Sequence, residues 1–154
     1  MSGTGAQVGE VAPSFSLEAD DGSRFESADL RGARALLVFY PGDNTPVCTR
    51  QLRDYRDGAA DFAGLGVRII GISKDGRASH AAFRSRHELP FTLLSDPDLA
   101  VAGRFGVRGA LGMKRAVFLL DEEGVVRYAK VEALPVFRRR REELLQAIRK
   151  LDEG

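Results

Sequence analysis

The residues of this sequence best suited to chemistry gather around one thiol, that of Cys48, the only cysteine among the 154 residues. Cys48 lies in the segment FYPGDNTPVCTRQL (39–52), where an apolar run is followed by a turn and by Thr-Pro, a helix-start signal. The start of a helix offers unpaired N–H groups and a partial positive charge, and both favour the thiolate, which is the nucleophilic form of cysteine. Thr45 lies three residues earlier, where its hydroxyl could donate a hydrogen bond to the thiolate or to a substrate.

The same thiol could instead be packing material, because free cysteines are among the most buried residues. One cysteine cannot form a disulfide within the chain, nor a zinc site built on several cysteines. Its position after a strand and at the start of a helix is nevertheless where open α/β sheets place their ligand sites. From this local pattern alone, a structural and a reactive thiol both remain open.

The elements that must position Cys48 follow from the apolar pattern. Ala35–Tyr40 and Val67–Ser73 are continuous apolar runs, typical of strands buried on both faces. Between them a helix is expected from Thr45, an N-cap residue followed by Pro46, to about Leu65, where glycines end it. Cys48 then falls in the first turn of this helix, at the carboxyl end of a central strand.

The rest of the chain continues the alternation of strands and helices, which predicts a parallel sheet with an antiparallel hairpin at its edge. The expectation is an α/β layered domain over residues 6–152, after a loose lead-in at residues 1–5. The other expected elements are a strand at Ser14–Leu17, a helix at Ala78–Leu89 with Ala82 and Phe83 inward, a strand at Phe91–Leu94, a helix from Asp96 to near Gly106, a hairpin of Arg115–Leu120 and Val125–Ala129, and a helix from Val136 to Leu151.

Composition and charge exclude several classes of function. The net charge of +1 gives no electrostatic support for binding nucleic acid or an anionic membrane. No stretch approaches the roughly 18 apolar residues of a membrane helix. The N-terminal residues lack the pattern of a signal peptide. A reducing cytoplasm, where a free thiol stays available, is therefore the expected compartment.

Other polar groups give weaker signals. His80 and His87 lie seven residues apart on one expected helix, but no third ligand accompanies them, so no metal site is expected. Arg56 either contributes to the field near Cys48 or forms a structural ion pair with Asp57. The basic run Arg138–Arg141 is expected to be a solvated face of the last helix.

Pro41, Thr45 and Cys48 form the pattern Pro-x-x-x-Thr-x-x-Cys, which resembles the active-site signature of peroxiredoxins. The resemblance is to the bacterioferritin comigratory protein group, also called the Q-type, and it covers about residues 6–152. Further matching pieces occur in the expected order: APSF (12–15), VRIIGIS (67–73), LPF (89–91), LLSD (93–96), and Arg115 followed by FLLD (118–121).

This resemblance implies a thioredoxin-like fold, with a central mixed sheet flanked by helices, and the reduction of hydrogen peroxide and organic hydroperoxides without metal, flavin or haem. It implies that Cys48 attacks the peroxide and becomes a sulfenic acid. Arg115 would hold the thiolate and polarise the peroxide, and Thr45 would align it. Pro41 would pack over the pocket and limit the access of water, while N–H groups near Val47 and Cys48 would receive developing charge.

The sequence departs from the family pattern at three positions. Many relatives carry a resolving cysteine five residues after the reactive one, where this chain has Arg53. The resemblance therefore implies a one-cysteine enzyme, whose reductant is an outside thiol such as thioredoxin, glutaredoxin or a low-molecular-weight thiol. Val47 stands where glycine is frequent, and Gln51 where glutamate is frequent. A monomer is expected, with a dimer left open.

Two alternatives remain beside the peroxidase. One is a redox-sensing or chaperone-like binding protein in which oxidation of Cys48 acts without significant turnover. The other is a thioredoxin-fold module with a structural cysteine, against which Thr45 and Arg115 argue, because neither is needed to pack a buried thiol.

Overall fold

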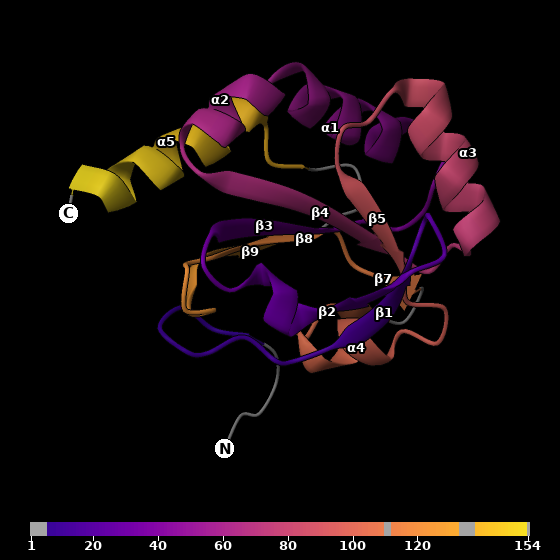
Figure 1. The fold of residues 1–154 in the computed structure, drawn as a ribbon, viewed down its shortest axis with the longest axis horizontal. Coiled ribbons are helices and arrows are strands. Elements are labelled where there is room, and N and C mark those ends of the chain that lie inside the picture. The colour runs from indigo at the N-terminus through magenta and orange to yellow at the C-terminus, as the bar shows by residue number, and fades with distance from the viewer. Residues whose placement is uncertain (1–5, 110–111, 133–137, 154) are drawn as a thin grey trace.

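A mixed sheet of seven strands forms the centre of the computed structural model, which describes residues 6–109, 112–132 and 138–153 (Figure 1). The strand order is β2-β1-β5-β4-β3-β8-β9, and β6 and β7 form a separate small ribbon. The strands are β1 Ser16–Ala19, β2 Arg24–Glu26, β3 Arg34–Phe39, β4 Val67–Ser73, β5 Thr92–Ser95, β6 Arg108–Gly109, β7 Gly112–Met113, β8 Ala116–Leu120 and β9 Val126–Val131.

The central strands β3 and β4 are the two apolar runs that the sequence singles out, and every residue from Ala35 to Phe39 is buried. They pair in parallel, with Leu37 opposite Ile70, and β5 continues the parallel arrangement beside β4. The expected hairpin is β8 and β9, which is antiparallel, and β8 lies antiparallel to β3 with Ala116 opposite Phe39. The hairpin therefore delivers the residue before Ala116 to the carboxyl end of β3.

Helices cover both faces of the sheet, and each face has its own apolar core (Figure 1). Helices α1, α2, α3 and α5 contribute to one core, which includes Cys48, Leu52 and Phe62. The short helix α4 packs on the opposite face around Phe39 and Phe105. The helices are the 3-10 turn η1 Ser27–Leu30, α1 Pro46–Asp57, α2 Ala59–Gly64, α3 Arg77–His87, α4 Ala100–Arg104 and α5 Arg141–Glu153.

The helix expected from Thr45 to Leu65 is in fact two helices, α1 and α2, which meet at Gly58. Glycine disfavours the interior of a helix, and the start of α5 packs closely against this one. A side chain at Gly58 would place its Cβ 2.8 Å from Cδ of Arg141 at the start of α5. The local pattern is helical on both sides, so the break could not be found from periodicity alone.

Several element ends also differ from the expectation. The last helix begins at Arg141, and residues 138–140 before it are not helical, so the prediction that the basic run lies in this helix is wrong for three of its four residues. The predicted start at Val136 lies outside the described residues. Helix α4 is shorter than predicted, and Ala82 of α3 is exposed although it was expected to face inward. Among the described residues no helix is both long and apolar enough to cross a membrane.

Candidate active site

Cys48 lies in the first turn of α1, directly beyond the carboxyl end of β3, as the sequence predicts. Its side chain has no exposed area and belongs to the core that α1 shares with β3 and α5. The fold therefore encloses the thiol, and burial alone would fit a structural cysteine. What distinguishes this thiol is the charged group that the fold brings to it.

That group is Arg115, which precedes β8 and is 3% exposed. Its Nη1 donates to Sγ of Cys48 at 3.1 Å and to Oε1 of Gln51 at 2.7 Å. Cys48 and Arg115 are far apart in the sequence, and the antiparallel pairing of β8 with β3 brings them together. A guanidinium held against a buried sulfur favours the thiolate, because the opposite charge replaces the water that burial removes.

Gln51 begins a chain of hydrogen bonds that leads from Arg115 toward the C-terminal helix. Its Nε2 donates to the Tyr55 hydroxyl at 3.0 Å, which donates to the Arg139 carbonyl oxygen at 2.6 Å. Nε of Arg139 donates to Glu132 at 2.9 Å, and the N–H of Glu132 donates to the carbonyl oxygen of Arg115 at 2.9 Å. Burial raises the pKa of Tyr55, so its hydroxyl stays a donor at neutral pH. These hydrogen bonds form a closed ring through Arg115, Gln51, Tyr55, Arg139 and Glu132.

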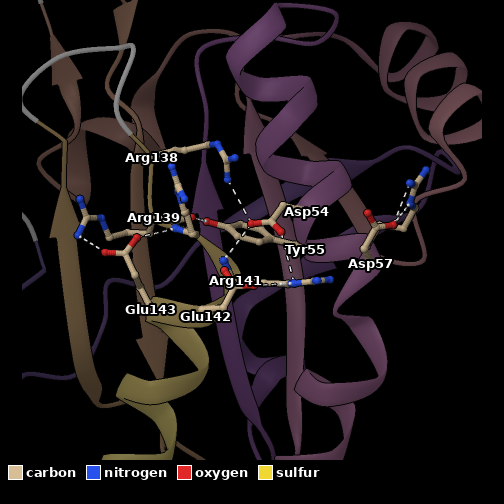
Figure 2. A network of polar contacts seen from close by, with 10 residues as sticks. Asp54, Tyr55, Asp57, Arg138, Arg139, Arg141, Glu142 and Glu143 are labelled. Atoms are coloured by element: carbon tan, nitrogen blue, oxygen red, sulfur yellow. Dashed lines mark hydrogen bonds and ion pairs between the residues drawn. The ribbon is translucent and has the colours of Figure 1, made fainter.

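A second set of contacts fixes α1 to the start of α5, as Figure 2 shows. The Asp54 carboxylate accepts hydrogen bonds from Nη1 of Arg138 at 3.1 Å and from the N–H of Arg141 at 3.0 Å. Arg139 also pairs with Glu143 at 3.0 Å. Arg138 and Arg141, two of the basic residues expected on a solvated face, therefore hold the helix that carries Cys48, and no local pattern marks these contacts.

Thr45 occupies the N-cap position, and Pro46 is the first residue of α1, both as expected. The Thr45 hydroxyl donates to the carbonyl oxygen of Gly42 at 3.0 Å, so the expected donation to the thiolate is not the contact made here. Within the described part of the chain no side chain caps α1. The first-turn N–H groups are thus not occupied by a capping side chain. Pro41 is half-buried two residues after the end of β3, and its packing over the sulfur stays a prediction.

Sequence reasoning missed a buried polar cluster in the turn before Cys48. The Asp43 carboxylate accepts hydrogen bonds from the Tyr40 hydroxyl at 2.7 Å and the Ser79 hydroxyl at 2.8 Å, and it pairs with Nδ1 of His80 at 2.8 Å. Burial works to raise the pKa of Asp43, but the hydrogen bonds from His80 and Tyr40 outweigh it and hold the pKa below its ordinary value. The sequence indicated Asp43 only as a turn residue.

The weaker signals resolve as structural contacts. Arg56 pairs with Asp57 at 2.9 Å and donates to the carbonyl oxygen of His87 at 2.8 Å. His80 is buried while His87 is half-exposed, so the two do not share one environment. In the regions that the structure describes, no group of three or more histidine, cysteine, aspartate or glutamate side chains could hold a metal ion.

Comparison with known proteins identifies the family. The profile of the AhpC/TSA family matches residues 8–129. The chain belongs to the AhpC/TSA family. Among peroxiredoxins, it is 41% identical over 128 residues to the putative peroxiredoxin bcp of Coxiella burnetii, covering 78% of this chain and 85% of the relative. It is 37% identical over 126 residues to peroxiredoxin Bcp of Bacillus subtilis, covering 77% and 80%.

Solved structures of the same peroxiredoxin group share the fold. Peroxidoxin BcpB from Mycobacterium tuberculosis matches with a TM-score of 0.84 and 28% identity, over 96% of this chain and 97% of that one. Peroxiredoxin Q from Xanthomonas campestris matches with a TM-score of 0.81 and 28% identity, over 88% and 90%. The predictions of a thioredoxin-like fold and of a Q-type peroxiredoxin with a single cysteine are confirmed. This AhpC/TSA protein is a thiol-dependent peroxidase, an oxidoreductase.

Proposed function

We propose that Cys48 is the nucleophile of a one-cysteine peroxidase that reduces hydrogen peroxide and organic hydroperoxides, and that an outside thiol regenerates it. The observation that carries this proposal is the 3.1 Å contact between Nη1 of Arg115 and Sγ of Cys48, in which the sulfur belongs to an apolar core. A guanidinium costs free energy to bury. A buried guanidinium on a sulfur makes chemical sense where that sulfur is used as a thiolate.

In the oxidative step, the Cys48 thiolate attacks the terminal oxygen of the hydroperoxide. An S–O bond forms as the O–O bond breaks, the cysteine is oxidised to a sulfenic acid, and the peroxide is reduced. The leaving oxygen takes up a proton and departs as water or an alcohol. Arg115 has one Nη1 hydrogen on the sulfur and can stabilise charge on the peroxide oxygens as the bond breaks.

Thr45 and Pro41 complete the proposed site. Because the Thr45 hydroxyl already donates to Gly42, its lone pairs are what it offers to a substrate, and it would accept the O–H of the incoming peroxide. The first-turn N–H groups of α1 would receive charge that develops on the departing oxygen. Pro41 would close the pocket from the side of β3 and exclude water.

In the reductive step, an outside thiol attacks the sulfenic sulfur and releases water, which leaves a mixed disulfide. A second thiol then attacks that disulfide, so that a disulfide of the reductant leaves and Cys48 returns as a thiolate. With Arg53 in place of a resolving cysteine and no second cysteine among the 154 residues, both thiols come from the reductant. Thioredoxin, glutaredoxin and low-molecular-weight thiols have the required chemistry.

We further propose that the chain acts as a monomer in the cytoplasm. A reducing compartment supplies the thiols that the cycle needs and keeps Cys48 free of adventitious disulfides. Light scattering at concentrations well above and below those of the assay tests the oligomeric state. A dimer that persists on dilution would contradict a monomer.

The experiment that tests the function is peroxide consumption with excess dithiothreitol, comparing the wild type, Cys48→Ser and the neighbouring control Thr49→Ser. We expect rapid loss of peroxide for the wild type and the control, none above background for Cys48→Ser, and one added oxygen on Cys48 by mass spectrometry without reductant. Equal slow loss in all three proteins would mean that Cys48 is structural. A single stoichiometric oxidation without turnover would favour the redox-sensing alternative.

A further inference from the structure

The turn that precedes Cys48 is held from several sides through a single residue, Asp43. Its side chain is buried and contacts Tyr40 at the end of β3 and both Ser79 and His80 of α3. Its backbone N–H donates to the Asp75 carboxylate at 2.7 Å, beyond the end of β4. One residue of the turn is thus tied to three separate elements of the fold.

Both ring nitrogens of His80 are engaged in this arrangement. Its Nε2 faces the carbonyl oxygen of Leu94 at 3.0 Å, and a carbonyl can only accept, so Nε2 carries a proton. Its Nδ1 lies 2.8 Å from Oδ2 of Asp43, whose carboxylate also accepts from Tyr40. His80 and Asp43 therefore form a buried hydrogen-bonded pair whose side chains are at most 1% exposed.

This buried pair holds Asp43, which lies in the turn just before the chain enters α1. Asn44 follows Asp43 in the left-handed conformation, with φ of 65°, and Thr45 then begins the helix. Asparagine tolerates that conformation better than most residues do. A fixed Asp43 followed by a sharp turn sets the direction of the first turn, and hence the position of Cys48 relative to Arg115.

We propose that Asp43 and His80 form a clamp that positions the turn before Cys48 for reaction with peroxide and that must open before an outside thiol can reach the oxidised sulfur. The inference rests on the role proposed for Cys48. We call this pair the Asp43–His80 clamp. Both members are positioning residues, since neither contacts the sulfur in the structure.

Reaction with peroxide needs the clamp closed, and reaction with the thiol reductant needs it open. Peroxide is small and reacts at a sulfur that is fully buried and held against Arg115. A thiol reductant is larger and must approach the sulfenic sulfur along the S–O axis, which a sulfur with no exposed area does not allow. Opening the turn exposes the sulfur, but it also separates the sulfur from its guanidinium.

Asp43→Asn and His80→Gln test the clamp, with His87→Gln as the matched control. His87 lies on the same helix, packs on Phe83, and is not among the groups that hold Asp43. Two rates are measured by stopped flow: oxidation of the reduced enzyme by hydrogen peroxide, and labelling of the thiol by 5,5′-dithiobis(2-nitrobenzoate). Every labelling event reports Cys48, because the sequence has no other cysteine.

We expect both clamp variants to react with peroxide about tenfold to 100-fold more slowly, as a displaced reacting group does. We expect the bulky reagent to label Cys48 on the order of tenfold faster, because the open state is more populated. Amide hydrogen exchange over residues 42–49 should quicken in both variants and not in His87→Gln. If His80→Gln does not fold, Asp43→Asn carries the test, because it removes the carboxylate from the same pair and keeps the imidazole in place.

Two results would overturn the clamp. One is that both folded variants keep both rates within about threefold of the wild type. The other is that peroxide reaction and labelling fall together, because the substitutions would then not have populated a state in which Cys48 is exposed. If Cys48→Ser consumed peroxide as fast as the wild type, the proposed function would fail instead, while labelling and hydrogen exchange would still decide whether the clamp holds the turn.

Discussion

Replacing Arg115 by methionine removes the guanidinium from the Cys48 sulfur while keeping an unbranched apolar stem. We expect the second-order rate constant for hydrogen peroxide to fall about 100-fold. The physical reason is the 3.1 Å contact in a region where Cys48 has no exposed area and Arg115 is 3% exposed. Water therefore cannot take over the role of the missing donor.

The magnitude follows from the geometry. Two unit charges about 3 Å apart attract by roughly 5 kcal/mol at an effective dielectric constant of about 20. Part of that attraction offsets the loss of water around the thiolate. A hydrogen bond to a charged group contributes a net of about 1.5–3 kcal/mol. The upper end, appropriate to a buried pair, corresponds to about a factor of 100 in rate.

The assay is single-turnover oxidation followed by stopped flow, together with the thiolate absorbance of the reduced protein at neutral pH. Arg115→Lys is the matched variant: it keeps the charge but not the planar fork that reaches both Cys48 and Gln51. We expect about a tenfold loss for lysine. If the folded methionine variant reacted with peroxide at the wild-type rate, the argument that Arg115 activates the thiol would be refuted.

The further predictions concern the free energy of unfolding, each measured by urea unfolding. Burial raises the pKa of Tyr55 and, together with the nearby carboxylate, that of Tyr40. The free energy of unfolding should therefore keep its full value below about pH 10. Above that pH the phenols of the unfolded chain ionise first, and the free energy of unfolding should fall by about 1.4 kcal/mol per pH unit for each residue. Tyr55→Phe should reduce that slope, and at neutral pH should cost about 1–3 kcal/mol, because the buried Gln51 amide and the half-buried Arg139 carbonyl oxygen lose their partner. Leu52→Ala, at a site with no exposed area, should cost about 2–5 kcal/mol through a cavity. Gly71→Ala should cost about 1–3 kcal/mol by overpacking, since its Cβ would lie 2.7 Å from Leu93. Urea midpoints equal to that of the wild type would contradict the estimates for Leu52→Ala and Gly71→Ala.

The order of elements could be predicted because the apolar pattern is unambiguous where strands are buried on both faces. The ends of helices could not, because side chains from elsewhere in the chain set them. Helix α5 begins at Arg141 because Asp54 of α1 accepts its N–H, and because Glu143 accepts the N–H of Arg140 at 2.9 Å. Only the second of these contacts leaves a local signal, a glutamate three residues after the cap.

In the candidate site, the residues of the family motif could be predicted from the sequence, but the residues that hold them in place could not. Cys48 and Arg115 could be proposed because a helix start and a family signature mark them. The support of Asp43 by His80 could not, because the two are 37 residues apart and neither type of residue is unusual in its local sequence. Pairing of distant polar groups depends on the fold and not on spacing.

The single buried cysteine has a consequence for the lifetime of the enzyme under oxidative stress. In the proposed cycle no neighbouring thiol intercepts the sulfenic acid, so its fate is a competition between outside thiol and a second molecule of peroxide. The second reaction yields a sulfinic acid, which thiols do not reverse. Because peroxide is the smaller reagent and the sulfur is enclosed, scarcity of reductant turns peroxide from a substrate into an inactivator. The ratio of thiol to peroxide, rather than the amount of peroxide alone, would then set how many turnovers each molecule completes.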